Sequence, residues 1–98
     1  MNVVYTDRFK FALANAFEAG SDRFGEATAE RTYRRIISHI EEFISEYPRT
    51  GRWRADIACF NTWIPGTPFV VFYRVRNDVL EVLALFHHAQ DTSDFDPD

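Results

Sequence analysis

His87, Arg74 and Tyr73 are the residues of this sequence whose types and spacing come nearest to a catalytic set. Cleavage of an RNA phosphodiester through its 2′-hydroxyl needs a general base, a general acid and cations that face the pentavalent phosphate. A histidine is the natural proton carrier near neutral pH, and an arginine can clamp a phosphate with two hydrogen bonds. Alternation along a strand would place Tyr73 and Arg74 on opposite faces, so at most one of them could share a site with a given histidine. The further candidates for such a site are Arg52, Arg54 and His88.

Each of these residues also has a structural interpretation. His87 falls at the end of a predicted strand, where a hydrogen-bonded structural role is common, and Tyr73 could be a core ring. Arg74 could pair with Glu81 across two strands, which contributes well under about 1 kcal/mol. The sequence has no carboxylate pair, glycine-rich phosphate loop or metal-ligand spacing. No catalytic residue is therefore favoured, and no metal or cofactor is predicted.

Binding is a second kind of chemistry that these residue types serve, because arginine and aromatic side chains dominate interface energies. Trp53 lies between Arg52 and Arg54, so alternation could present both arginines on one side of a strand. Either tryptophan could instead pack in the core. The predicted binding residues for a target or a partner are Arg49, Arg52, Trp53, Arg54, Trp63, Arg74 and His87.

The elements that must position these side chains belong to one small domain. The chain has 98 residues, of which 46% are hydrophobic, 27% charged and 16% aromatic. This composition is typical of a globular protein with one modest core. The net charge of −4 is unevenly placed, because the last eight residues hold four aspartates and no base. The body of the chain is neutral, so a basic footprint for nucleic acid is absent overall.

The cellular location is predicted to be the cytoplasm. Cys59 is the single cysteine, so it has no partner for an internal disulfide, and its apolar neighbours indicate a small buried side chain. The first residues lack the basic start and apolar run of a signal peptide. No apolar stretch approaches the roughly 18 residues that a membrane span needs.

The first half of the chain is predicted to form a short strand and a helical hairpin. Residues 2–6 are β-prone, and Thr6 or Asp7 could cap a helix that ends between Gly20 and Gly25, with Phe24 tucked under the turn. A second helix, ended by Pro48, is indicated by apolar residues at a period of 3.6. Its predicted apolar stripe consists of Ala29, Tyr33, Ile36, Ile37, Ile40, Phe43, Ile44 and Tyr47.

The second half is predicted to form an antiparallel meander of strands at 54–63, 69–75 and 79–86. Residues 65–68 (PGTP) and the pair Asn77-Asp78 mark the two turns. The order β-α-α-β-β-β predicts an α+β fold in which the helical hairpin covers one face of a four-stranded, mainly antiparallel sheet. The other face would stay partly open. Residues 91–98 form an acidic tail, in which Phe95 could either dock or fray.

Four segments of the chain resemble, in order and spacing, segments of RelE/ParE-type toxins. They are 24–31 (FGEATAER) at the start of the second helix, 47–52 (YPRTGR) at the link into the sheet, 69–75 (FVVFYRV) in the central strand, and 82–87 (VLALFH) with Asp91 at the last strand. The resemblance covers nearly all of residues 3–91 and favours the ParE-like branch. Two features depart from the family pattern: the body is neutral where members are typically basic, and residues 88–90 (HAQ) replace the usual glycine and arginine.

The resemblance implies a single RelE/ParE-like domain at 1–90, followed by the acidic tail at 91–98. It further implies the toxin of a type II toxin–antitoxin pair that poisons DNA gyrase by binding, with a cognate antitoxin as the partner in a hetero-oligomer. The alternative within the family is a ribosome-dependent mRNA endonuclease using His87, Arg74 and Tyr73. A third alternative is a non-toxic binding module with the same fold.

Overall fold

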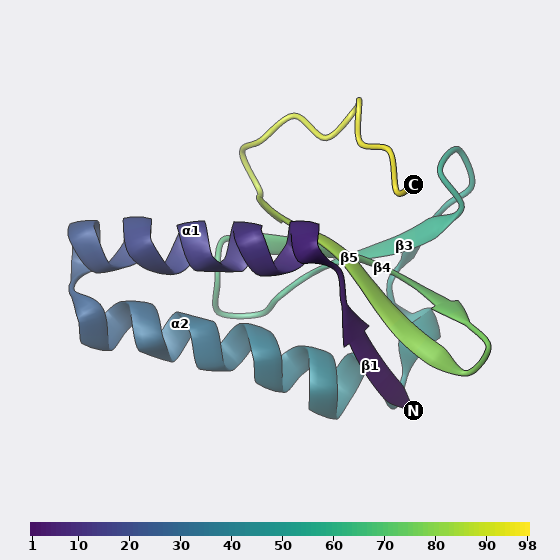
Figure 1. Ribbon diagram of the computed structural model, residues 1–98, viewed down its shortest axis with the longest axis horizontal. Coiled ribbons are helices and arrows are strands. Elements are labelled where there is room, and N and C mark those ends of the chain that lie inside the picture. The colour runs from purple at the N-terminus through teal and green to yellow at the C-terminus, as the bar shows by residue number, and fades with distance from the viewer.

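Two helices and a five-stranded mixed sheet make up the fold (Figure 1). The computed structural model describes residues 1–98. In chain order the elements are β1 (Asn2–Tyr5), α1 (Asp7–Phe24), α2 (Glu26–Ser38), the π-helical η1 (His39–Ile44), the short 3₁₀ helix η2 (Pro48–Thr50), β2 (Arg52–Arg54), β3 (Cys59–Trp63), β4 (Phe69–Arg76) and β5 (Val79–His87). The predicted α+β fold with a strand and a helical hairpin before the meander is confirmed.

The sheet has the strand order β1-β5-β4-β3-β2, so the first strand lies beside the last one. β1 is parallel to β5, and all other neighbours are antiparallel. The prediction of a single strand at 54–63 was wrong, because β2 ends at Arg54, a tight turn follows, and β3 begins at Cys59. The sheet therefore has five strands instead of the predicted four. Arg54 holds the Asp56 carboxylate in that turn with hydrogen bonds of 3.0 and 2.7 Å, and Ala58 has a φ of 52°. A backbone with that φ cannot continue an extended strand.

Of the two caps that the sequence predicted for α1, Thr6 or Asp7, the structure has Thr6. The Thr6 hydroxyl accepts a hydrogen bond from the Phe9 amide at 3.1 Å and donates one to the Leu83 carbonyl at 2.8 Å, which ties the helix to β5. The helix ends at Gly25, whose φ of 90° few other residues tolerate. The expectation that Phe24 lies under the turn was wrong, since its side chain is 66% exposed. A turn of one residue leaves no space beneath it.

The second helical segment continues from α2 through η1 and ends before Pro48. Ala29, Ile36, Ile40 and Ile44 are buried, as predicted from their period. The predicted stripe was too wide, however, because its outer members Tyr33, Phe43 and Tyr47 are exposed. They lie on the flank of the helix, where the Phe43 ring stacks on His39 and meets Tyr47 at a tilt of 50°.

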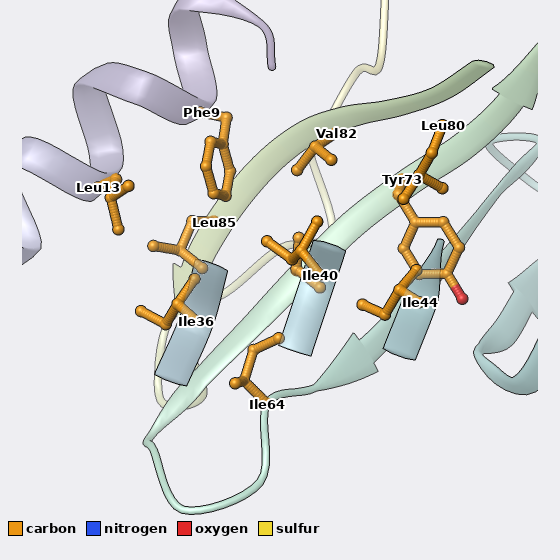
Figure 2. Packing of buried hydrophobic residues seen from close by; sticks show 11 residues of the cluster. Phe9, Leu13, Ile36, Ile40, Ile44, Ile64, Tyr73, Leu80, Val82 and Leu85 are labelled. Atoms are coloured by element: carbon orange, nitrogen blue, oxygen red, sulfur yellow. The ribbon is translucent and has the colours of Figure 1, made fainter. Parts of the chain in front are cut away.

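The main core fills the space between the helices and one face of the sheet, which we call the helix-side face. Figure 2 shows Ile36, Ile40 and Ile44 in a row, pointing from the helix toward β4 and β5. Phe9 and Leu13 reach the same cluster from α1. Burial of these side chains is the main stabilising contribution, because each contributes roughly 1.5–3 kcal/mol.

A second, smaller cluster lies on the opposite face of the sheet, which we call the tail-side face. A β-bulge in β5 turns both Leu83 and Ala84 to this face, where they pack with Phe72 and Cys59. Phe95 from the C-terminal tail completes the cluster and is only 7% exposed. In Figure 1 the tail and α2 lie on opposite sides of β4 and β5. The face that was expected to be partly open is therefore covered in part by residues 91–98.

Candidate functional site

The tail-side face gathers three of the predicted binding arginines. Arg52 pairs in register with Asn61, and Arg54 pairs with Cys59, which belongs to the tail-side cluster. Alternation along β2 and β4 then places Arg52, Arg54 and Arg74 on this one face, as the spacing around Trp53 predicted. Trp63 alternates with Cys59 along β3 and lies on the same face, 57% exposed.

Ion pairs hold two of these arginines in place. Arg74 Nε lies 2.8 Å from Glu81 Oε1, which confirms the cross-strand pair, and Arg74 Nη1 lies 3.0 Å from Asp98 Oδ1. Arg54 pairs with Asp56 at 2.7 Å, and the hydrogen bond from Arg54 lowers the pKa of that carboxyl. Arg52 is exposed and makes no ion pair. The face thus has both fixed and available guanidinium groups.

Cys59 lies beneath these arginines as a buried free thiol, in agreement with the sequence. Burial raises the pKa of the Cys59 thiol, although the charges of Arg54 and Arg74 oppose the shift. The side chain is therefore neutral and acts as a small apolar filler. No three His, Cys, Asp or Glu side chains lie close enough to share a metal ion.

Trp53 and Arg49 do not belong to the tail-side face, but they share a hollow with one of its arginines, Arg74. Trp53 is on the helix-side face, where its ring meets Phe60 edge-on at 4.9 Å and stays 52% exposed. Arg49 belongs to η2. The two residues line a hollow of about 840 Å³ at the end of the sheet, together with Arg74 and Arg76. Asp98 also lines this hollow, so the tail ends at its rim.

The three residues of the nuclease alternative do not share a site. Tyr73 is fully buried on the helix-side face, and its hydroxyl donates a hydrogen bond to the Pro48 carbonyl at 2.8 Å. Burial also raises the pKa of Tyr73. Arg74 lies on the opposite face. His87 pairs with Phe69 at the far end of β4, four residues from Tyr73, a separation of roughly 13 Å along a strand.

His87 lies instead beside an apolar groove between the helical hairpin and the end of the sheet. The groove has a volume of about 720 Å³, and most of its lining residues are hydrophobic. Phe17 and Tyr33 meet edge-on in it at 6.3 Å, and Phe24 is at its outer end. The His87 ring packs edge-on against Phe69, and its Nδ1 accepts a hydrogen bond from the Ala89 amide at 3.2 Å.

Sequence reasoning missed the groove as a site. Its signal was present, because Phe17, Phe24 and Tyr33 are aromatic residues placed around the hairpin turn at Gly25. Phe24 and Tyr33 were interpreted as packed residues, whereas the structure leaves both exposed at the groove. Neither helix is long and apolar enough to cross a lipid bilayer.

Comparison with known proteins agrees with this architecture. Residues 3–92 match the family described as the ParE toxin of the type II toxin–antitoxin system, parDE. Among solved structures, the fold is similar to the chromosomal ParDE toxin–antitoxin system from P. aeruginosa, with a TM-score of 0.76 and 15% sequence identity over 89% of this chain and 95% of that chain. A search of the curated proteins by sequence gives no match. Since the family match spans almost the whole chain, this protein belongs to the ParE toxin family of type II toxin–antitoxin systems.

Proposed function

We propose that this ParE-type toxin inhibits growth by binding DNA gyrase, and that a cognate antitoxin neutralises it by covering part of its surface. In this proposal the toxin acts in the cytoplasm, holds its target by protein–protein contacts and needs no cofactor. The working surface is the tail-side face with Arg52 and Trp63, together with Arg49 and Trp53 at the end of the sheet.

One observation carries the choice of a binding mechanism over RNA cleavage. The general base, the phosphate clamp and the phenol of the nuclease alternative are separated, because Tyr73 is buried, Arg74 is on the other face and His87 is at the far end of the strand. Acid–base catalysis needs groups within hydrogen-bond reach of one substrate atom. Binding needs only exposed arginine and aromatic anchors on a rigid support, which this sheet offers.

The groove beside the hairpin is the surface that we assign to the antitoxin. Its lining includes the small residues Ala12, Ala16 and Gly20, which leave room for another chain. An amphipathic helix that lays its apolar face in such a groove is a recurrent mode of recognition. The exposed aromatic side chains of Phe24 and Tyr33 would anchor that helix.

Expression of the toxin without its antitoxin tests the target. We expect growth arrest with intact transcripts and with accumulation of gyrase-cleaved DNA. His87→Ala should leave this arrest unchanged, whereas Arg52→Ala should weaken it. Arg34→Ala is the matched control, because Arg34 is an exposed arginine on α2, away from the sheet. Transcripts cut within coding regions, with no gyrase-cleaved DNA, would favour the nuclease instead. A folded protein that fails to slow growth would be a non-toxic binding module.

A charge placed in the groove tests the antitoxin surface. Ala16→Glu should abolish binding of the protein encoded by the neighbouring gene, measured by calorimetry, while the toxin still arrests growth. Ala14→Glu is the control, because Ala14 is exposed on α1 and does not line the groove. Equal binding of the two variants would show that the antitoxin docks elsewhere.

A further inference from the structure

The C-terminal tail brings acidic side chains onto the face that carries the arginines. Residues 91–98 include Asp91, Asp94, Asp96 and Asp98, with Phe95 in their midst. The tail does not pair with any strand, since no backbone hydrogen bond joins it to the sheet. What holds it in place is therefore a small number of side-chain contacts.

An aromatic anchor is the first of these contacts. The Phe95 ring lies 4.8 Å from the Phe72 ring and 5.5 Å from the Phe86 ring, between centroids, and it closes the tail-side cluster. The Arg8 guanidinium covers the ring at 5.1 Å. This site thus accepts one aromatic side chain and caps it with a cation.

Two charge contacts follow the anchor, both on its C-terminal side. Arg8 Nη1 donates a hydrogen bond to the Asp96 carbonyl at 2.8 Å, and the Asp98 carboxylate pairs with Arg74 at 3.0 Å. Asp98 itself is largely exposed, so its ion pair with Arg74 is weak and exchangeable. Asp98 also lines a hollow that it shares with Arg49 and Arg76.

We propose that the tail-side face is a docking surface for an extended acidic peptide of a partner protein, and that residues 91–98 occupy it by intramolecular competition. The partner peptide carries an aromatic residue for the Phe95 site, an acidic residue for Arg74, and further acidic residues that enter the hollow beside Arg76. The tail is the evidence for this chemistry, because it is an acidic segment with one aromatic residue already seated there. The inference does not depend on gyrase being the target.

A polynucleotide fits this surface less well than a peptide. Glu81 and Asp56 lie beside Arg74 and Arg54 and offset much of their charge. Nucleic-acid binding depends on net positive charge that neutralises several phosphates. The buried site of Phe95 instead favours a ligand with an apolar side chain.

Binding of a peptide in trans tests the proposal. The probe is a fluorescently labelled synthetic peptide with the sequence of residues 91–98, added to the full-length protein and to its Phe95→Ala variant. We expect the variant to bind the peptide about tenfold more tightly, because its own tail no longer competes at high effective concentration. Binding should weaken between about 0.05 M and 0.5 M salt, and a peptide in which alanine replaces phenylalanine should not bind.

A second pair of variants covers the possibility that Phe95→Ala does not fold. Asp98→Asn removes the contact with Arg74 and keeps the aromatic anchor, so the peptide should bind about twofold to fivefold more tightly. Asp94→Asn is the matched control, because the Asp94 side chain makes no hydrogen bond or ion pair. This variant should bind the peptide with the same affinity as the unchanged protein. Equal affinity of Asp98→Asn and Asp94→Asn, no peptide binding up to about 1 mM, or tighter binding of an oligothymidylate than of the peptide would each overturn the proposal.

Discussion

The Tyr73 hydroxyl provides the clearest single-residue test of the mechanism. It is buried and donates its hydrogen bond to the Pro48 carbonyl, so its role is to fix the link between the second helix and β2. Tyr73→Phe should lower the free energy of unfolding by about 1 kcal/mol, because the carbonyl loses its partner. Growth arrest should not change. Urea denaturation and a growth assay check the two outcomes.

Tyr47→Phe is the control for this substitution, since Tyr47 is exposed and its hydroxyl makes no hydrogen bond within the protein. Its free energy of unfolding should stay within about 0.5 kcal/mol of the unchanged protein. A Tyr73→Phe protein that keeps its stability but no longer arrests growth would contradict the structural role and point to a catalytic phenol.

One half-buried tyrosine, Tyr5, and one buried tyrosine, Tyr73, make the stability of the protein sensitive to alkaline pH. Burial raises the pKa of Tyr5, and its hydrogen bond of 2.6 Å to the Glu41 carboxylate raises it further. Burial also raises the pKa of Tyr73. A folded-state pKa above the unfolded value of about 10 means that stability is complete below pH 10 and is lost as the pH rises beyond it. The denaturant concentration at the unfolding midpoint should therefore decrease as the pH is raised from about 10 to about 12.

Tyr5→Phe tests this assignment because it removes one of the two groups. The variant should lose stability at pH 8, where the hydrogen bond to Glu41 is missing, but its midpoint should fall less steeply above pH 10. The slopes are compared by chemical denaturation at matched salt. Parallel slopes for the two proteins would show that other groups cause the alkaline loss.

Residue by residue, the sequence was most informative where neighbours in the chain decide the outcome. Alternation around Trp53 correctly placed Arg52 and Arg54 on one side, and the apolar neighbours of Cys59 correctly indicated burial. The pairing of Arg74 with Asp98 could not be predicted, because the two residues meet only through the path of the tail. The separation of Tyr73 from His87 likewise depends on the register of β4 and β5.

At the scale of the elements, two glycines determine how closely neighbouring elements pack: Gly20 between α1 and α2, and Gly51 before β2. A methyl group at Gly20 would lie 3.5 Å from the Ala29 Cβ, an ordinary contact between α1 and α2. A methyl group at Gly51 would overlap the Tyr73 hydroxyl and come within 3.0 Å of the Asn61 carbonyl. Gly20→Ala should therefore raise the free energy of unfolding by about 0.5–1 kcal/mol, since alanine favours a helix. Gly51→Ala should lower it by about 1–3 kcal/mol.

Urea denaturation of the two glycine variants provides the comparison. Each is the control for the other, because both add one methyl group. The changes in the free energy of unfolding should have opposite signs only if α1 and α2 leave room for a methyl group at Gly20 and the segment before β2 leaves none at Gly51. A destabilising Gly20→Ala would mean that α1 and α2 are packed too closely at Ala29 to accept the methyl group.

Some boundaries of helices and strands could be predicted from the sequence, and others could not. The cap at Thr6, the end of α1 between Gly20 and Gly25, and the turn at Asn77-Asp78 were predictable, because each follows from local backbone chemistry. The positive φ values of Asn77 and Asp78 confirm the turn. The turn that separates β2 from β3 was not predictable, since the side chain of Arg54 closes on Asp56 in it. The width of the second helix's apolar stripe depends on how far the sheet extends beneath it.

At the scale of the whole molecule, the sheet has a core on each face, and the two cores differ in how they are closed. The helix-side core is closed by α1 and α2, whereas the tail-side cluster is closed by the short tail through Phe95. The order of the elements predicted the first core. The second was left open between a docked and a frayed tail, because one aromatic residue among aspartates carries no periodic pattern.

Alanine substitutions in the two cores should lower the free energy of unfolding by different amounts. Ile40→Ala leaves a cavity between fixed elements and should cost about 2–5 kcal/mol. Phe95→Ala should cost only about 1–2 kcal/mol, because the tail can leave the sheet and enter water without opening the helical hairpin. Limited proteolysis should then cut the tail of Phe95→Ala first, with the remaining domain still folded. If Phe95→Ala costs as much as Ile40→Ala, with loss of hydrogen-exchange protection throughout the helices, the tail would instead be an integral part of one cooperative core.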